Sequence, residues 1–127
     1  MAGARNYDEL DAWKLSDAVR VRIYEICKSP RFRSHLRLRE QLTDAADSAC
    51  SNIAEGFGRY YPKEFARFLK ISRGSLAEIA DRLRSAVLAG IVKETDVDDI
   101  VALTHRARGA CTRLIKYLEG ADPPGRA

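Results

Sequence analysis

The residues of this chain best suited to chemistry are clustered arginines, and the chemistry that they suit is phosphate binding. The stretch from Lys28 to Glu40 holds no acidic residue before its last position and contains four arginines: Arg31, Arg33, Arg37 and Arg39. A guanidinium can hold a phosphate through two parallel hydrogen bonds. Phe32 and His35 lie in the same stretch and offer surfaces on which unpaired bases can stack. The stretch therefore predicts a contact with RNA or DNA.

A second group of cations lies on a predicted helix. At about 100° per residue, four basic side chains fall on the side of that helix opposite its apolar row. The four are Lys63, Arg67, Lys70 and Arg73, and Arg59 comes just before them. Glu64 is the only acidic residue between positions 59 and 73. This basic stripe predicts a second surface for phosphates.

Two interpretations of these charges stay open. The solvent-facing sides of bundle helices are commonly charged, so the cations could serve solubility alone. The acidic residues at positions 94–99 are expected to make an opposite corner negative, and that corner could receive the basic surface of another subunit. The formal net charge of +4 and the pI of about 9.1 permit an anionic partner without requiring one.

Patterns for catalysis or metal binding are absent from the sequence. A helical bundle that holds metal ions needs inward-facing carboxylates and histidines, and no Glu-x-x-His pair occurs. No phosphate-binding glycine loop and no nucleophile elbow occurs either. The sequence therefore predicts a protein that is not an enzyme and has no catalytic residue, no metal site and no cofactor.

The remaining polar residues suggest a structural role. Cys27, Cys50 and Cys111 lie beside apolar neighbours and are predicted to be small buried side chains in a reducing compartment. Asp44 and Asp47 lie off the apolar row of their helix and are expected to be solvated. No apolar run approaches the roughly 20 residues that span a bilayer, and the N-terminus lacks a signal-peptide pattern. We therefore expect a cytoplasmic protein without membrane contact.

Helices must position these residues, because apolar side chains recur at helical spacing and no strand pattern occurs. Four helices are predicted, over about residues 8–28, 36–57, 62–89 and 96–119. Long amphipathic helices with short connections are typical of an antiparallel up-down-up-down four-helix bundle. We expect an all-α chain with a single domain over residues 1–127 and a short frayed tail at its C-terminus.

Local signals predict where the helices start. Asn6, with Glu9 three residues later, has the pattern of an N-cap for the first helix. Ser34 and Thr95 are candidate caps for the second and fourth helices, and Pro62 suits the first position of the third.

Glycines predict where two helices end. Gly56 and Gly58 are expected to supply backbone freedom at the end of the second helix, and Gly90 ends the third. The small side chain at position 56 also permits a neighbouring helix to approach closely.

The corner between the second and third helices contains a candidate polar latch. Asn52 lies at the edge of its helix's apolar row, where an amide can bond a neighbouring helix; Ser75 and Glu78 are the expected partners. Arg59 could neutralise either Glu55 or Glu78. We expect the latch to fix the helical register, with the alternative that it shapes a subunit or partner surface.

Two stretches carry a family resemblance: QLTDAADSACSNIAEGFGR and, after a short corner, KEFARFLKISRGSLAEIADRL. They resemble the bacterial four-helix-bundle family named for proteins encoded in intervening sequences of 23S rRNA genes. The resemblance extends over about residues 7–119, and its most specific parts are the run Asn52 to Gly56 and the later Gly74 to Glu78. The arginine-rich first corner departs from the usual family pattern.

The resemblance implies a bundle that forms ring-shaped homo-oligomers, commonly pentamers, without enzymatic activity. The family is similar to the accessory protein of diversity-generating retroelements, a basic pentamer that engages a reverse transcriptase and RNA. We therefore expect a non-enzymatic oligomeric accessory protein that binds RNA or DNA and possesses a protein partner such as a reverse transcriptase. The alternative is a structural or protein-interaction oligomer with no nucleic-acid role.

Overall fold

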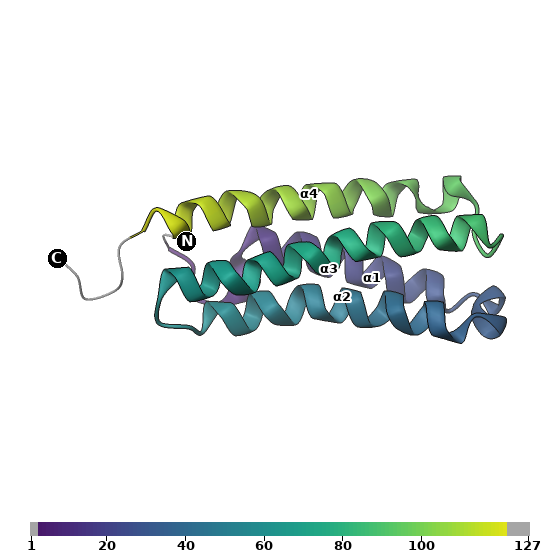
Figure 1. The fold of residues 1–127 in the computed structure, drawn as a ribbon, viewed down its shortest axis with the longest axis horizontal. Helices are drawn as coiled ribbons and strands as arrows, with labels where there is room; N and C mark the ends of the chain where they lie inside the picture. Colours follow the sequence, from purple (N-terminus) through teal and green to yellow (C-terminus); the bar gives the residue numbers. More distant parts are fainter. Residues whose placement is uncertain (1–2, 122–127) are drawn as a thin grey trace.

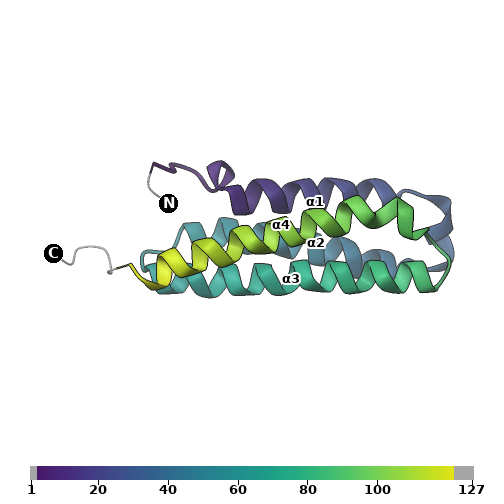
Figure 2. The same cartoon turned by 90° about the horizontal axis from the view of Figure 1, so that it is seen from above.

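The computed structural model describes residues 3–121 and consists of four long helices (Figure 1). The helices are α1 (Asp11–Cys27), α2 (Leu36–Phe57), α3 (Pro62–Leu88) and α4 (Glu94–Glu119), with 3-10 turns η1 (Tyr7–Glu9) and η2 (Pro30–Ser34). No strand occurs among the described residues. α1 and α3 each pack against both α2 and α4. Successive helices run in opposite directions, so the fold is the antiparallel up-down-up-down bundle that the sequence predicted (Figures 1 and 2).

The core lies along the bundle axis, where the apolar row of each helix meets the other three. Ile23, Leu42, Leu76 and Ile100, one from each helix, have no exposed surface. Removing such side chains from water is the main stabilising contribution to the fold. Small residues of α2 also belong to the core, among them Ala46 and Ala49. They let the backbone of a neighbouring helix come close.

The bundle has two chemically different ends. We call the end that holds the corner at residues 58–61 the tyrosine end; the start of α1 and the end of α4 lie there too (Figure 1). The opposite end, the arginine end, holds the corners at residues 28–35 and 89–93. This arrangement decides which charged groups are neighbours.

The starts of α1 and α4 differ from the sequence prediction. Asn6 and Glu9 cap the short turn η1 and not α1: Glu9 Oε2 accepts hydrogen bonds from the backbone N–H groups of Arg5 (2.6 Å) and Asn6 (2.8 Å). α4 begins at Glu94, so Thr95 lies inside the helix. Asp96 Oδ2 accepts from the backbone N–H of Lys93 at 3.0 Å and takes the capping role.

The start of α2 also lacks its predicted cap. Ser34 belongs to η2, and His35 is the N-cap residue, without a hydrogen bond from its side chain. η2 itself has a cap, because the Ser29 side chain accepts from the backbone N–H of Arg31. The serine nearest to α2 was therefore the wrong choice, since a 3-10 turn intervenes.

Only one of the predicted helix-ending glycines uses a left-handed backbone. Gly90 has φ of +74°; its N–H donates to Val87 O, and the N–H of Ile91 donates to Ala86 O, both at 3.0 Å. This is the paired hydrogen-bond pattern of a helix C-terminus that favours glycine. Gly58 has φ of −78°, so the backbone freedom predicted there is not used.

The predicted frayed tail falls largely outside the described residues, from position 122 onwards. Between residues 3 and 121, no helix is both long enough and apolar enough to cross a membrane.

Candidate nucleic-acid interface

Lys63 and Arg67 form the most accessible part of the basic stripe. Pro62 begins α3, and Phe65 and Leu69 are buried in the core, which leaves Lys63 and Arg67 on the outward side of the helix. Lys63 and Arg67 are both exposed and lie one helical turn apart, about 6 Å along the surface. Within residues 3–121, neither has an acidic partner. Their positive charges are therefore available to an external anion.

The other two cations of the stripe contact α4. Lys70 Nζ lies 2.7 Å from Glu119 Oε2, and Arg73 Nη1 donates to Thr112 Oγ1 at 3.2 Å. Lys70 remains exposed, and an ion pair at such a surface contributes about 1 kcal/mol or less. A phosphate could still reach Lys70 by displacing the glutamate, whereas Arg73 is half-buried between the helices.

Arg59 is occupied within its own corner. Its Nη2 lies 2.8 Å from Glu55 Oε1, and its guanidinium carbon lies 4.8 Å from the centroid of the Phe68 ring. Glu55 was one of the two partners that the sequence left open, and Glu78 pairs instead with Arg82 at 3.6 Å. Arg59 thus joins the end of α2 to α3.

The arginine-rich corner lies at the opposite end of the bundle from the stripe. Arg33, Arg37 and Arg39 are exposed and have no acidic partner in the described part of the chain. Arg31 Nη1 donates to the carbonyl oxygen of Ile91 at 3.5 Å. The 27 residues of α3 correspond to about 40 Å, so one short nucleic-acid segment cannot reach both groups on one protomer.

The acidic corner is not opposite the arginine-rich corner, as the sequence had suggested, but beside it. Because successive helices are antiparallel, the corner at residues 28–35 and the corner at residues 89–93 lie at the same end. The hydrogen bond from Arg31 to Ile91 joins the two corners. Nearby, Arg22 Nε donates to Asp99 Oδ2 at 3.0 Å and joins α1 to α4. This hydrogen bond lowers the pKa of Asp99. The arginine end therefore carries both signs of charge, which weakens its field.

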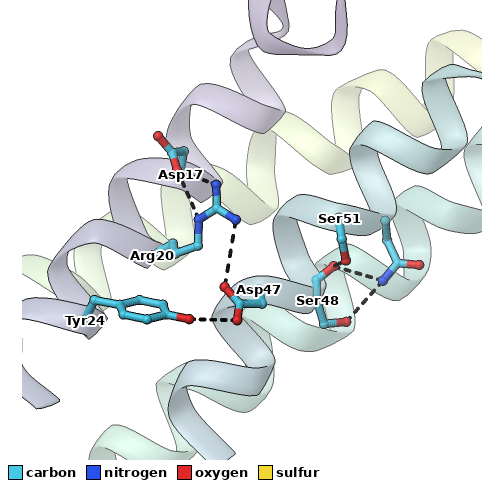
Figure 3. A network of polar contacts seen from close by, with 7 residues as sticks. Asp17, Arg20, Tyr24, Asp47, Ser48 and Ser51 are labelled. Atoms are coloured by element: carbon cyan, nitrogen blue, oxygen red, sulfur yellow. Dashed lines mark hydrogen bonds and ion pairs between the residues drawn. The ribbon is translucent and has the colours of Figure 1, made fainter.

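The polar contact between α2 and α3 centres on Ser48, whose surroundings on α2 are drawn in Figure 3. Ser75 Oγ donates to Ser48 Oγ at 2.9 Å. Asn52 Nδ2 donates to the same oxygen at 3.1 Å and to the Ser48 carbonyl at 2.9 Å. The predicted bonds from Asn52 to Ser75 and Glu78 are therefore wrong. Asn52 acts within α2, and Ser48 makes the bond across to α3.

At Gly56, α2 and α3 pack too closely to leave room for a side chain. A Cβ atom at this position would lie 2.7 Å from Phe65 Cδ1 and 2.7 Å from Phe68 Cβ. Real Cβ atoms essentially never come so close to other heavy atoms. The corner therefore needs the absence of a side chain here, as the sequence predicted, although not a special backbone conformation.

The sequence interpretation missed a charged cluster between α1 and α2 (Figure 3). Tyr24 Oη donates to Asp47 Oδ2 at 2.7 Å, and this hydrogen bond raises the pKa of Tyr24. Arg20 Nη2 lies 2.8 Å from Asp17 Oδ1, and Arg20 Nη1 lies 3.8 Å from Asp47 Oδ1. Asp47 is thus engaged and not merely solvated. The spacing of Asp17 and Arg20 could have signalled their pairing, whereas the bond to Asp47 depends on tertiary packing.

Two tyrosines beside the stripe were also missed as site residues. Tyr60 is 62% exposed and Tyr61 is 50% exposed. Their ring centroids lie 4.9 Å apart, with ring planes at 85°. The signal was present in the sequence, because an aromatic pair between Arg59 and Lys63 is the combination that nucleic-acid surfaces use.

The cysteines are unsuited to nucleophilic chemistry. Cys27, Cys50 and Cys111 are buried, and burial raises their pKa values to about 11, 12 and 11. Both histidines are exposed, whereas the three thiols are buried. The described residues contain no group of three or more histidine, cysteine, aspartate or glutamate side chains able to hold a metal ion.

Comparison with known proteins assigns the chain to one family. A family model described as 23S rRNA-intervening sequence protein matches residues 8–112, which include all of α1, α2 and α3 and most of α4. A comparison with curated proteins gave no match.

Proposed function

The chain belongs to the 23S rRNA-intervening sequence protein family, and from this premise we propose that it is a non-enzymatic oligomeric protein that binds nucleic acid through basic helix faces. The name of the family favours an RNA-related role. The observation that carries the proposal is the exposure of Lys63 and Arg67 without acidic partners in residues 3–121. Phosphate contacts of this kind bind the backbone and do not read sequence.

In the proposed interface, the basic stripe is the main contact with nucleic acid and the arginine-rich corner is a secondary contact. Lys63 and Arg67 supply unpaired charge, and Lys70 lies one turn farther along the same face. Arg33, Arg37 and Arg39 are equally exposed, but acidic residues share their end of the bundle. We therefore expect the stripe to contribute more to affinity than the corner.

A salt titration tests this proposal. Binding of single-stranded RNA and DNA should weaken as salt rises, with a slope of roughly −0.7 in the log–log plot for each phosphate contact. The double variant Lys63→Gln, Arg67→Gln should flatten the slope by about 1.4, because two contacts are lost.

The matched control is a double variant that removes two positive charges from a different part of the surface. Arg84 and Lys93 are exposed, lie towards the arginine end and have no acidic partner in the described chain. The double variant Arg84→Gln, Lys93→Gln should leave the slope unchanged. Equal flattening by both double variants would show a net-charge effect and contradict an interface at the stripe.

The oligomeric part of the proposal has its own support. The resemblance implies a homo-oligomer, most often a pentamer, and apolar side chains remain exposed on the protomer: Val21 and Tyr24 on α1, Ile71 and Leu88 on α3. Such side chains are common in subunit contacts. Light scattering of the pure protein should give the mass of several protomers; a monomer at all concentrations would contradict this part.

The second candidate function is a structural or protein-interaction oligomer with no nucleic-acid role. It is favoured by the mixed charge at the arginine end, where the acidic and arginine-rich corners are neighbours. A partner protein of complementary charge could bind there. Absence of RNA and DNA binding at low salt would favour this candidate.

A further inference from the structure

The two tyrosines at the corner between α2 and α3 have a high exposure for aromatic side chains. Tyr60 and Tyr61 keep 62% and 50% of their surface exposed, whereas Phe65, four residues farther on, keeps 2%. They lie between Arg59 and Lys63, at the start of the basic stripe. We propose that this corner is a stacking site for unpaired nucleotides. This inference rests on the nucleic-acid binding proposed above.

The corner orders the backbone that carries the Tyr61 ring. The carbonyl oxygen of Tyr61 accepts hydrogen bonds from the backbone N–H groups of Glu64 (3.0 Å) and Phe65 (3.3 Å), so the residue is bound to the first turn of α3. The Phe57 and Phe65 rings, one on each of the two helices that the corner joins, meet edge to face with their centroids 6.1 Å apart. A ring on ordered backbone loses less conformational freedom when a base stacks on it than a ring on a mobile segment would.

The ring geometry distinguishes unpaired from paired nucleotides. The planes of Tyr60 and Tyr61 lie at 85° to each other, so two bases stacked on them would also be nearly perpendicular. Successive bases of a duplex lie parallel and are covered by their neighbours. A single strand can turn one base away from the next and present both faces to aromatic side chains.

The cations beside the rings suit the strand that carries those bases. Lys63 follows the tyrosine pair directly, and Arg67 lies one turn farther along α3; both are exposed without an acidic partner in residues 3–121. A base on Tyr61 would thus leave its phosphate near Lys63. Stacking together with backbone charge gives affinity without sequence preference.

The test compares three variants on two probes. The probes are a short unstructured RNA and the same sequence as a duplex. Tyr60→Leu, Tyr61→Leu removes the rings and should weaken single-strand binding by about tenfold or more, since each stacked base contributes substantially. Duplex binding should stay unchanged. Tyr60→Phe, Tyr61→Phe keeps the rings and should bind like the unaltered protein.

Tyr117→Leu is the matched control. Tyr117 is 55% exposed and lies at the same end of the bundle, but it lines a hollow formed with Leu10 and Lys14 between α1 and α4 and does not belong to the corner between α2 and α3. The Tyr117→Leu variant should leave the affinities for the single strand and for the duplex unchanged. Thermal melting should show that all variants fold.

Each outcome separates this inference from the proposed function. If the unaltered protein binds neither probe, the nucleic-acid function itself fails. If it binds both but the leucine variant loses nothing, or loses single-strand and duplex binding equally, only the stacking site is refuted. If the leucine variant instead changes the oligomeric mass, the tyrosines are a contact with a second copy, which also overturns the stacking site.

Discussion

Ser48 is the side chain on which the polar contact between α2 and α3 depends. It is half-buried, and its oxygen accepts from one residue on its own helix and one on the neighbouring helix. Removal of this acceptor leaves the Ser75 hydroxyl without its partner, whereas Asn52 Nδ2 keeps only its bond to the Ser48 backbone carbonyl. An unsatisfied donor away from water costs more than the hydrogen bond itself contributes.

Ser48→Ala should therefore lower the free energy of unfolding by about 1–2 kcal/mol. Asn52→Ala should cost less, about 0.5–1 kcal/mol, because Ser75 keeps its bond to Ser48. Alanine improves helix propensity similarly at both positions, so the comparison is matched. Urea unfolding measures both values. A larger loss of stability from Asn52→Ala than from Ser48→Ala would show that the polar contact depends on Asn52 and would contradict this account.

At this scale the sequence identified a pairing where the partners are close along the chain. The pairing of Arg59 with Glu55 follows from their spacing of four residues. The choice of Ser48 over Asn52 depends on how α2 and α3 are aligned along their axes, which no local pattern specifies. The engagement of Asp47 with Tyr24 has the same cause, since 23 residues separate them.

At the scale of elements, α2 and α3 pack closely at Gly56. Two aromatic residues of α3 occupy the space that any side chain at this position would need. The arrangement connects the end of α2 to the start of α3 directly below the tyrosine corner. Loss of this packing should therefore affect stability and the geometry of the proposed interface together.

Gly56→Ala should lower the free energy of unfolding by about 1–3 kcal/mol, because overpacking outweighs the gain in helix propensity of about 1 kcal/mol. Gly74→Ala is the control, since a Cβ there meets no atom within 4 Å. It should raise the free energy of unfolding by about 0.5–1 kcal/mol. Thermal or urea unfolding compares the two; equal effects would contradict the close-packing account.

The helices themselves were largely predictable, and their starts less so. α2 spans the predicted residues, and Pro62 marks the start of α3. α1 and α4 start a few residues from their predicted positions because several polar residues near each start could act as caps. Hydrophobic periodicity places a helix, whereas the choice among neighbouring caps depends on small energy differences.

At the scale of the whole molecule, the antiparallel topology decides the electrostatics. It brings the arginine-rich and acidic corners together at one end and leaves the basic stripe beside exposed tyrosines at the other. The bundle was predictable from the sequence, but the acidic corner was wrongly predicted to lie opposite the arginine-rich corner, whereas the two lie side by side. Cations on one helix could be grouped from spacing alone, whereas the partners of Lys70 and Arg73 lie on α4, far along the chain.

The most direct test of the central claim, that this chain binds nucleic acid at its tyrosine end, is photocrosslinking. The unaltered protein would be irradiated with a thiouridine-containing single-stranded RNA at physiological salt, and the attached peptides identified by mass spectrometry. We predict crosslinks within residues 60–67, including the tryptic peptide from Tyr60 to Lys63. Crosslinks confined to residues 31–39, or none at all, would contradict the claim.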